Sequence, residues 1–146
     1  MTDTLEDALK AIADIVGRVH GIDSSMEYPS DKVPPGVWAM VHPVDGVYSH
    51  EPQGVCQGLH NIGIYVACAR VDLPKTLARL YPLGELVVGA LESSPTLLDT
   101  VETFGDISYV FDYSINVGSP SAPAYVSGWS FTIIGVKIHN TTIISL

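Results

Sequence analysis

The sequence predicts a single α+β domain, with two helices packed on one face of a mixed, mainly antiparallel β-sheet of about five strands. Three observations lead to this class. An amphipathic helical repeat opens the chain, several apolar segments alternate with the two-residue period of a strand, and turns rich in proline and glycine separate them. At 146 residues, 47% hydrophobic and 16% charged, the chain has the size and composition of one globular domain over residues 1–146.

The first helix is predicted over residues 4–19, where the apolar positions follow the i, i+3, i+4, i+7 spacing of a helix with one buried face. Thr4 is placed to cap the first turn, and Asp7 stands three residues later in the arrangement of a capping box. Gly21 is placed to end the helix. A loop is expected over residues 20–36, because proline and glycine interrupt regular structure there.

A hairpin is predicted next, from a short strand over residues 37–41 and a return strand that begins at residues 47–50. Asp45-Gly46 lies between them and is a typical hairpin-turn pair. Residues 51–58 are expected to form a loop. Residues 59–70 are predicted as a long strand whose even positions face the core, because those positions carry the larger apolar side chains.

The second half of the chain predicts one helix and two strands. The helix covers residues 72–91, with a break near Pro82. Apolar and polar side chains alternate over residues 106–116, which is typical of a half-exposed strand. Residues 125–138 form the last long strand, and its apolar phase changes midway, which indicates a β-bulge near Gly135.

The charge balance bears on possible partners. Seven basic residues face sixteen acidic ones, for a net charge of −9. The basic residues are scattered singly, so the clustered phosphate contacts of a nucleic-acid-binding protein are not expected, and DNA would pass an acidic surface without adhering tightly. No apolar run is long enough to span a membrane and the acidic N-terminus is unlike a signal peptide, so we expect folding in a cytoplasm.

No spacing in the sequence indicates a catalytic, cofactor-binding or metal-binding site, and we expect neither an enzyme nor a cofactor. The nearest approach to a metal site is His42 with His50 and Glu51, which would meet across the predicted hairpin. Cys56 lies close to His60 in the sequence, but no third group that would orient the histidine is evident. Ordinary turn residues are the favoured interpretation of both sets.

The two cysteines are expected to be free thiols. Cys56 and Cys68 are twelve positions apart, and on one extended strand they would be separated by roughly 40 Å, far too much for a disulfide. Cys68 alternates with the apolar residues of its predicted strand. It is therefore expected to be buried as a small hydrophobic side chain.

Three stretches, taken in order, carry a resemblance to a known family. They are Thr-Leu-Glu-Asp-Ala-Leu at 4–9, His-Asn-Ile-Gly-Ile-Tyr-Val-Ala-Cys-Ala-Arg at 60–70 running into Asp-Leu-Pro at 72–74, and Ser-Pro-Thr-Leu at 94–97 leading into Thr-Val at 100–101. With the order of elements around them, they resemble the tail-terminator (tail-completion) subunits of long-tailed bacteriophages. The resemblance spans most of the chain.

The resemblance implies a structural virion protein without catalytic residues. Such subunits form a ring, usually a homo-hexamer, at the head-proximal end of the tail tube, where the ring stops tube growth and offers a docking face for the neck. The implied partners are other copies of the chain, the tail tube protein and a neck or connector protein. DNA would pass through the ring without tight binding, no membrane is involved, and assembly in the host cytoplasm would place the protein in the virion.

The candidate interface residues lie on the predicted hairpin, at the start of the last strand, and in residues 139–146, which are expected to form an extended assembly tail. They are Tyr48, His50, Gln53, Tyr125, Thr141, Ile143, Ile144 and Leu146. Two other classes stay open. Another neck or head–tail connector subunit would join portal-type rings instead of tail tubes, and a small ligand-binding domain or enzyme would show a pocket with converging polar groups.

Overall fold

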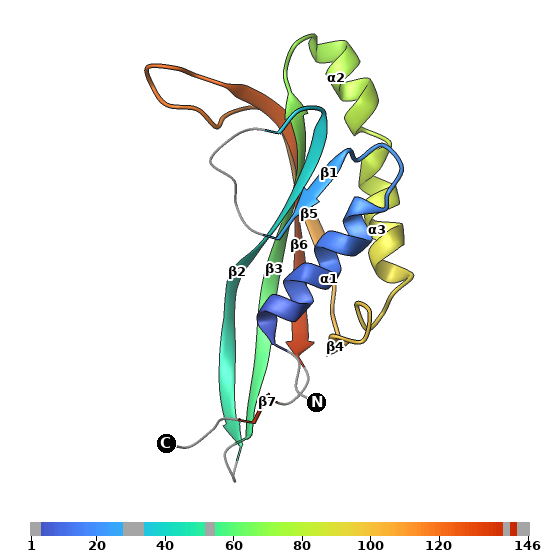
Figure 1. The fold of residues 1–146 in the computed structure, drawn as a ribbon, viewed down its shortest axis with the longest axis vertical. Helices are drawn as coiled ribbons and strands as arrows, with labels where there is room; N and C mark the ends of the chain where they lie inside the picture. Colours follow the sequence, from blue (N-terminus) through green and yellow to red (C-terminus); the bar gives the residue numbers. More distant parts are fainter. Residues whose placement is uncertain (1–3, 28–33, 52–54, 139–140, 143–146) are drawn as a thin grey trace.

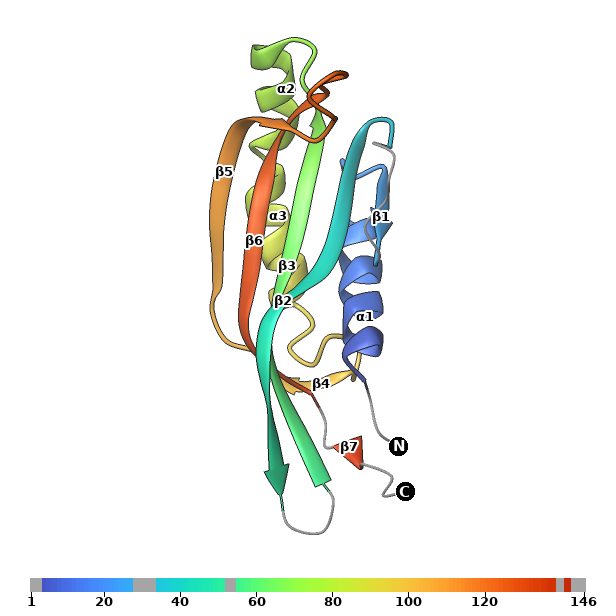
Figure 2. The same ribbon diagram turned by 90° about the vertical axis from the view of Figure 1, so that its left-hand side faces the viewer.

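The structure is a computed structural model that describes residues 4–27, 34–51, 55–138 and 141–142; side chains are described for all of these except residues 50, 51, 55–57, 141 and 142. A twisted seven-stranded sheet forms one layer, and three helices lie against one of its faces (Figure 1). In Figure 2 the sheet lies in front and the helices behind it. The predicted α+β class, with helices on one face of a mixed sheet, is confirmed.

The first helix, α1 (Leu5–Gly17), begins with the predicted capping box. The Thr4 hydroxyl accepts a hydrogen bond from the Asp7 N–H at 3.2 Å, and the Asp7 carboxylate accepts one from the Thr4 N–H at 2.9 Å. The helix ends two residues before the predicted end at residue 19. A side chain at Gly17 would collide with Ser25, so this glycine lets the following strand pass close to the helix.

The second predicted helix is two helices, α2 (Leu73–Leu80) and α3 (Leu83–Glu92), and the break falls at Pro82 as the sequence predicts. The Asp72 carboxylate caps α2 by accepting the Lys75 N–H at 3.4 Å. Proline has no N–H to donate to the preceding turn, so the helix cannot continue through residue 82. The change of direction lets α3 bury Leu83, Val87 and Leu91 against the sheet.

The sheet is built around β3, which runs antiparallel to β2 on one side and to β6 on the other. Beyond β2 lies β1, the one parallel neighbour, while β4 and β5 both pair with β6 and β7 pairs with β3. The strands are β1 (Ser24–Met26), β2 (Val37–Glu51), β3 (Val55–Ala69), β4 (Val101–Thr103), β5 (Ile107–Asn116), β6 (Tyr125–Ile138) and β7 (Thr141–Thr142).

The predicted hairpin turn at Asp45-Gly46 is wrong. Strand β2 runs through both residues, and they pair with Asn61 and His60 of β3. Each has a cross-strand role instead: the Asn61 amide donates to the Asp45 carboxylate at 2.6 Å, and a Cβ at residue 46 would collide with the His60 ring. A register shift after Pro43 absorbs the irregularity that the proline introduces, so the strand continues to Glu51.

Two predicted loops contain strands. Within residues 20–36 the short strand β1 pairs in parallel with Trp38, Ala39 and Met40, and the Asp23 carboxylate beside it accepts the Val37 N–H at 2.8 Å. Within residues 51–58, β3 already begins at Val55. Three residues are too few to show a periodic pattern, and in the second segment Gly58 lies against the rings of His60 and Tyr48 within the strand.

The bulge near Gly135 is confirmed. Ile134 and Gly135 of β6 together oppose the single residue Asn61 of β3, because Ile62 pairs with Ile133 and His60 pairs with Val136. Gly135 has a φ of +69°, which favours glycine, and its N–H donates to the Asn61 side chain at 3.1 Å. The bulge moves Val136 and Ile138 to the buried side of the strand.

The core lies between the helices and the sheet. The even positions of β3 face it as predicted, with Ile62, Ile64, Val66 and Cys68 buried. A second, smaller cluster lies on the other face of the sheet, where Trp38, Ala67 and Val126 are buried. Burial raises the pKa of the Cys68 thiol, which is free as predicted. The side chain of Cys56 is outside the described part of the chain.

Candidate functional site

The distal halves of β2 and β3 form a two-stranded extension, which we call the arm: residues 46–51 paired with residues 55–60. Strand β6 pairs with β3 only as far as Leu59, and beyond that point the edge of β3 that faces away from β2 is paired, among the described residues, with β7 alone. The arm therefore projects past the layer of helices, as both ribbon views show (Figures 1 and 2). Three large side chains on it are exposed, Val47 at 62%, Tyr48 at 59% and Leu59 at 50%.

His60 lies at the base of the arm and lines one cavity together with Thr4 and Leu5 at the start of α1. This imidazole is only 5% exposed, its Nε2 has no hydrogen-bond partner among the described residues, and its ring centroid lies 5.0 Å from that of Tyr48 in an edge contact. Burial lowers the pKa of His60, so the neutral ring is favoured. A small cavity of about 160 Å³ adjoins it, lined by Thr4, Leu5, Tyr48, Gly58, His60 and Ile138.

The outer edge of the sheet at β5 is a second exposed element. Strand β5 pairs with β6 on one side and with no other described strand. Three large side chains on it are exposed: Tyr109 at 64%, Val110 at 61% and Tyr113 at 55%. A ten-residue edge with unpaired backbone groups and apolar side chains is a natural surface for pairing with another chain.

A groove of about 380 Å³ lies between α3 and strands β5 and β6, and we call it the aromatic groove. Trp129 is central to it, stacked on Phe131 with ring centroids 5.5 Å apart and in edge contact with Tyr109 at 5.2 Å. The Trp129 indole N–H donates to the Leu80 carbonyl at 2.7 Å, which fixes the ring. The lining residues are Gly84, Glu85, Val88, Gly89, Glu92, Tyr109, Trp129 and Phe131.

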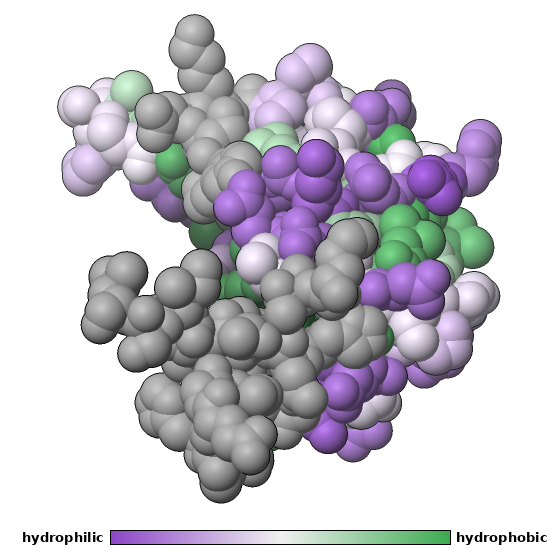
Figure 3. Space-filling view, turned by 60° about the horizontal axis from the view of Figure 1, so that its bottom comes forward, coloured by the Kyte–Doolittle hydropathy of each residue, from purple (hydrophilic) through white to green (hydrophobic). Residues whose placement is uncertain are grey.

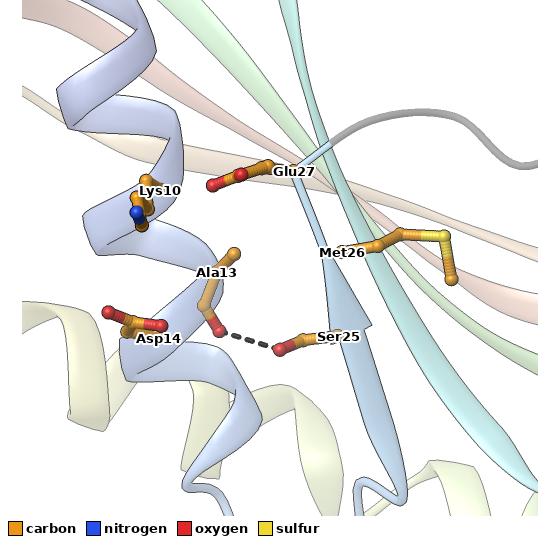
Figure 4. A pocket seen from close by; sticks show the side chains of 6 residues that line it. All are labelled: Lys10, Ala13, Asp14, Ser25, Met26 and Glu27. Carbon is orange, nitrogen blue, oxygen red and sulfur yellow. Dashed lines mark hydrogen bonds between the residues drawn. The ribbon is translucent and has the colours of Figure 1, made fainter.

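A third cleft, of about 370 Å³, is lined by residues of α1 and of the β1 segment (Figure 4). Lys10 and Asp14 line its helix side and Glu27 its strand side. The Ser25 hydroxyl donates to the Ala13 carbonyl at 2.8 Å, and no histidine lines the cleft. Ser25 thus holds the strand against the helix, and the cleft does not present the paired nucleophile and base of a hydrolase.

The residues that came nearest to a metal site in the sequence, His42, His50 and Glu51, do not meet across a hairpin. His42 and His50 lie on the same strand, eight positions or about 26 Å apart, because the turn expected between them is absent. Across the described residues, no three His, Cys, Asp or Glu side chains are grouped closely enough to hold a metal ion. None of the helices in the described chain combines the length and the apolar character that a membrane span needs.

The candidate interface residues are divided among different places. Tyr48 and the backbone of His50 lie on the arm, whereas Tyr125 starts β6 at the opposite end of the sheet, opposite Asn116. Within the expected assembly tail over residues 139–146, Thr141 pairs with Cys56 of the same chain. Four of the residues lie outside the described part of the chain: Gln53, Ile143, Ile144 and Leu146.

Sequence reasoning missed the aromatic groove, whose residues come from three elements that are far apart in the chain.

Seen from the end that carries the arm, much of the described surface is hydrophilic, and hydrophobic side chains gather on the side where Figure 1 shows α3 and the segment after it (Figure 3). Comparison with protein-family models and with curated proteins finds no match to this chain.

Proposed function

We propose that this protein is a structural subunit that assembles into a closed ring at the head-proximal end of a bacteriophage tail tube, where it ends tube growth and docks the neck. The observation that carries the proposal is the arm. It extends past the helix-covered core and exposes Val47, Tyr48 and Leu59.

A two-stranded arm with exposed apolar side chains would be stabilised by contact with a second subunit. An isolated two-stranded ribbon is marginally stable in water, because it buries little apolar surface. Transfer of an exposed valine or leucine side chain into an interface contributes roughly 1.5–3 kcal/mol, so the exposed arm residues could supply much of the association energy of one contact. A second subunit that covers the arm would both order it and remove its apolar surface from water.

The arm and the β5 edge are different patches at different places on the molecule. Contact between unlike patches is heterologous, and it produces a ring when the rotation between neighbours closes. The net charge of −9 per chain suits a ring that DNA traverses, because an acidic wall repels the phosphate backbone.

The test compares two valines that are both exposed in the monomer. Val47 lies on the arm at 62% exposure, and Val71 lies in the connection between β3 and α2 at 91%. Native mass spectrometry and electron microscopy of purified protein should show rings for the unaltered chain and for Val71→Asp. Val47→Asp should remain monomeric, with a loss of at least about tenfold in association, since the charge would be buried in the contact. A monomer at high concentration, or equal behaviour of both variants, contradicts the proposal.

A second measurement separates a tail terminator from a connector subunit. Purified protein should bind and cap tail tubes, and it should leave portal-type rings free. Tails assembled without it should vary in length or fail to join heads. Binding to portal-type rings alone would instead identify another head–tail connector.

A further inference from the structure

We propose that the aromatic groove is a docking site for a basic segment of a partner protein, in which one arginine side chain lies against Trp129 and Tyr109 between the carboxylates of Glu85 and Glu92. This inference does not depend on ring assembly, because the groove is complete within one subunit.

The floor of the groove favours a planar cation. The faces of aromatic rings carry partial negative charge and attract a guanidinium group within about 6 Å. Trp129 is half-buried and held by its hydrogen bond to Leu80, and Tyr109 is 64% exposed beside it. The aromatic floor is thus fixed in place but open to solvent. The planar guanidinium group of arginine can stack on such a surface, whereas the compact ammonium group of lysine stacks less well.

The wall of the groove adds charge of the right sign. Glu85, Val88, Gly89 and Glu92 stand on α3 at the i, i+3, i+4, i+7 spacing, which places them on one helix face with a carboxylate at each end. The ion pairs found among the described residues are Arg79 with Asp23 and Lys137 with Glu102, so neither groove carboxylate is neutralised there. No basic residue is among those that line the groove.

The surroundings favour a protein segment over a free small cation. The aromatic surface continues from Trp129 to Phe111 at 4.9 Å between ring centroids, and from Phe111 to Tyr81 and Tyr113 at 5.5 and 5.2 Å. Tyr81 and Tyr113 are both at least half exposed, at 50% and 55%. An extended segment whose arginine occupies the groove can therefore place its neighbouring apolar side chains along this surface.

Gly89 offers a way to close the groove without disturbing the fold. It lines the groove, it is exposed, and a Cβ added there would meet no atom within 4 Å. Gly89→Leu should fill the groove, whereas Gly89→Ala adds a similar helix preference and leaves most of the space open. Gly84 is unsuitable for this purpose, since a side chain at that position would collide with Trp129.

The probe is a nine-residue peptide with one arginine flanked by leucines, and its matched control carries neutral citrulline instead of arginine. Binding is followed by the indole N–H signals in a ¹H–¹⁵N spectrum. Trp129 reports on the groove, and Trp38, buried in the cluster on the opposite face, is the internal reference. The arginine peptide should shift the Trp129 signal saturably and leave the Trp38 signal in place.

The expected affinity of the citrulline peptide is at least about tenfold lower, because the cation–π contact and both carboxylate contacts are lost together. Glu85→Gln with Glu92→Gln should weaken the arginine peptide several-fold, Gly89→Leu should abolish the shift, and Gly89→Ala should retain it. The proposal is overturned if the arginine peptide causes no saturable shift of the Trp129 signal. It is equally overturned if both peptides bind alike, or if the arginine peptide binds alike to both Gly89 variants. It is also overturned if raising the concentration of the protein alone moves the Trp129 signal in Gly89→Ala but not in Gly89→Leu, since a second copy would then occupy the groove.

Discussion

At the scale of single residues, His60 couples the arm to the domain. Its neutral ring is buried between the arm and the start of α1, and burial lowers its pKa in the folded protein. The unfolded chain, with an ordinary histidine pKa near 6.5, takes up a proton first as the pH falls. Unfolding therefore binds protons in that range, so the stability is fully present above about pH 6.5 and decreases as the pH falls below it.

Because burial lowers the pKa of His60 in the folded protein, we expect the free energy of unfolding to decrease between pH 7.5 and pH 5. Urea titrations at the two pH values measure the difference. His60→Gln should show a smaller decrease than the unaltered protein, while His42→Gln, on the neighbouring strand, should keep the full decrease. The same decrease in all three proteins would show that His60 is not the group responsible.

Residues that act on their own backbone were the ones that could be predicted from the sequence. Thr4 and Asp7 cap a helix through bonds within three positions, Pro82 breaks a helix because it has no N–H to donate, and Gly135 was predicted by the change of apolar phase around it. Asp45-Gly46 misled because its partners, Asn61 and His60, lie across the sheet. Tyr48 could be proposed as an interface residue from its own position in the sequence. The grouping of Glu85, Tyr109 and Trp129 could not, because the fold brings them together from three elements that are far apart in the chain.

At the scale of elements, β7 has only two residues but a defined position, because it pairs with β3 in the arm. Strand β6 leaves β3 at Leu59, and β7 occupies the same edge at Val55 and Cys56. The strand therefore covers backbone groups of the arm that would otherwise be open to solvent or to an unwanted partner. Strand β7 thus pairs with the arm of its own chain, within the segment that the sequence predicts to be an assembly tail.

Deletion of residues 141–146 should loosen the arm and leave the core intact. Hydrogen exchange of peptides that cover residues 46–60 should become faster, because the outer edge of β3 loses its hydrogen-bond partner. The free energy of unfolding should change by less than about 1 kcal/mol, since β7 adds little to the packed core. The matched control is Thr141→Ala with Thr142→Ala, which keeps the backbone pairing and should exchange like the unaltered arm. Unchanged exchange after the deletion would mean that β7 does not hold the arm.

At the scale of the whole molecule, shape and charge act in opposite directions. The arm and the β5 edge expose apolar surface that favours association, while −9 charges on every chain oppose it. Repulsion between like-charged subunits acts over the Debye length, which shortens from about 10 Å in 0.1 M salt to about 3 Å in 1 M salt. Apolar contacts are not weakened by this screening.

Ring assembly should consequently strengthen with salt. Between 0.05 and 0.5 M NaCl, the protein concentration at which half of the chains are assembled should fall several-fold, because screening removes repulsion and leaves the apolar contacts. Sedimentation velocity over a concentration series measures it, with sucrose at equal osmolality as a control for crowding and hydration. The aromatic groove should respond in the opposite sense, since an arginine held by two carboxylates is weakened by the same screening. Dissociation of the rings on adding salt would mean that ion pairs, and not the apolar arm, join the subunits, and the arm-centred account of assembly would then have to be abandoned.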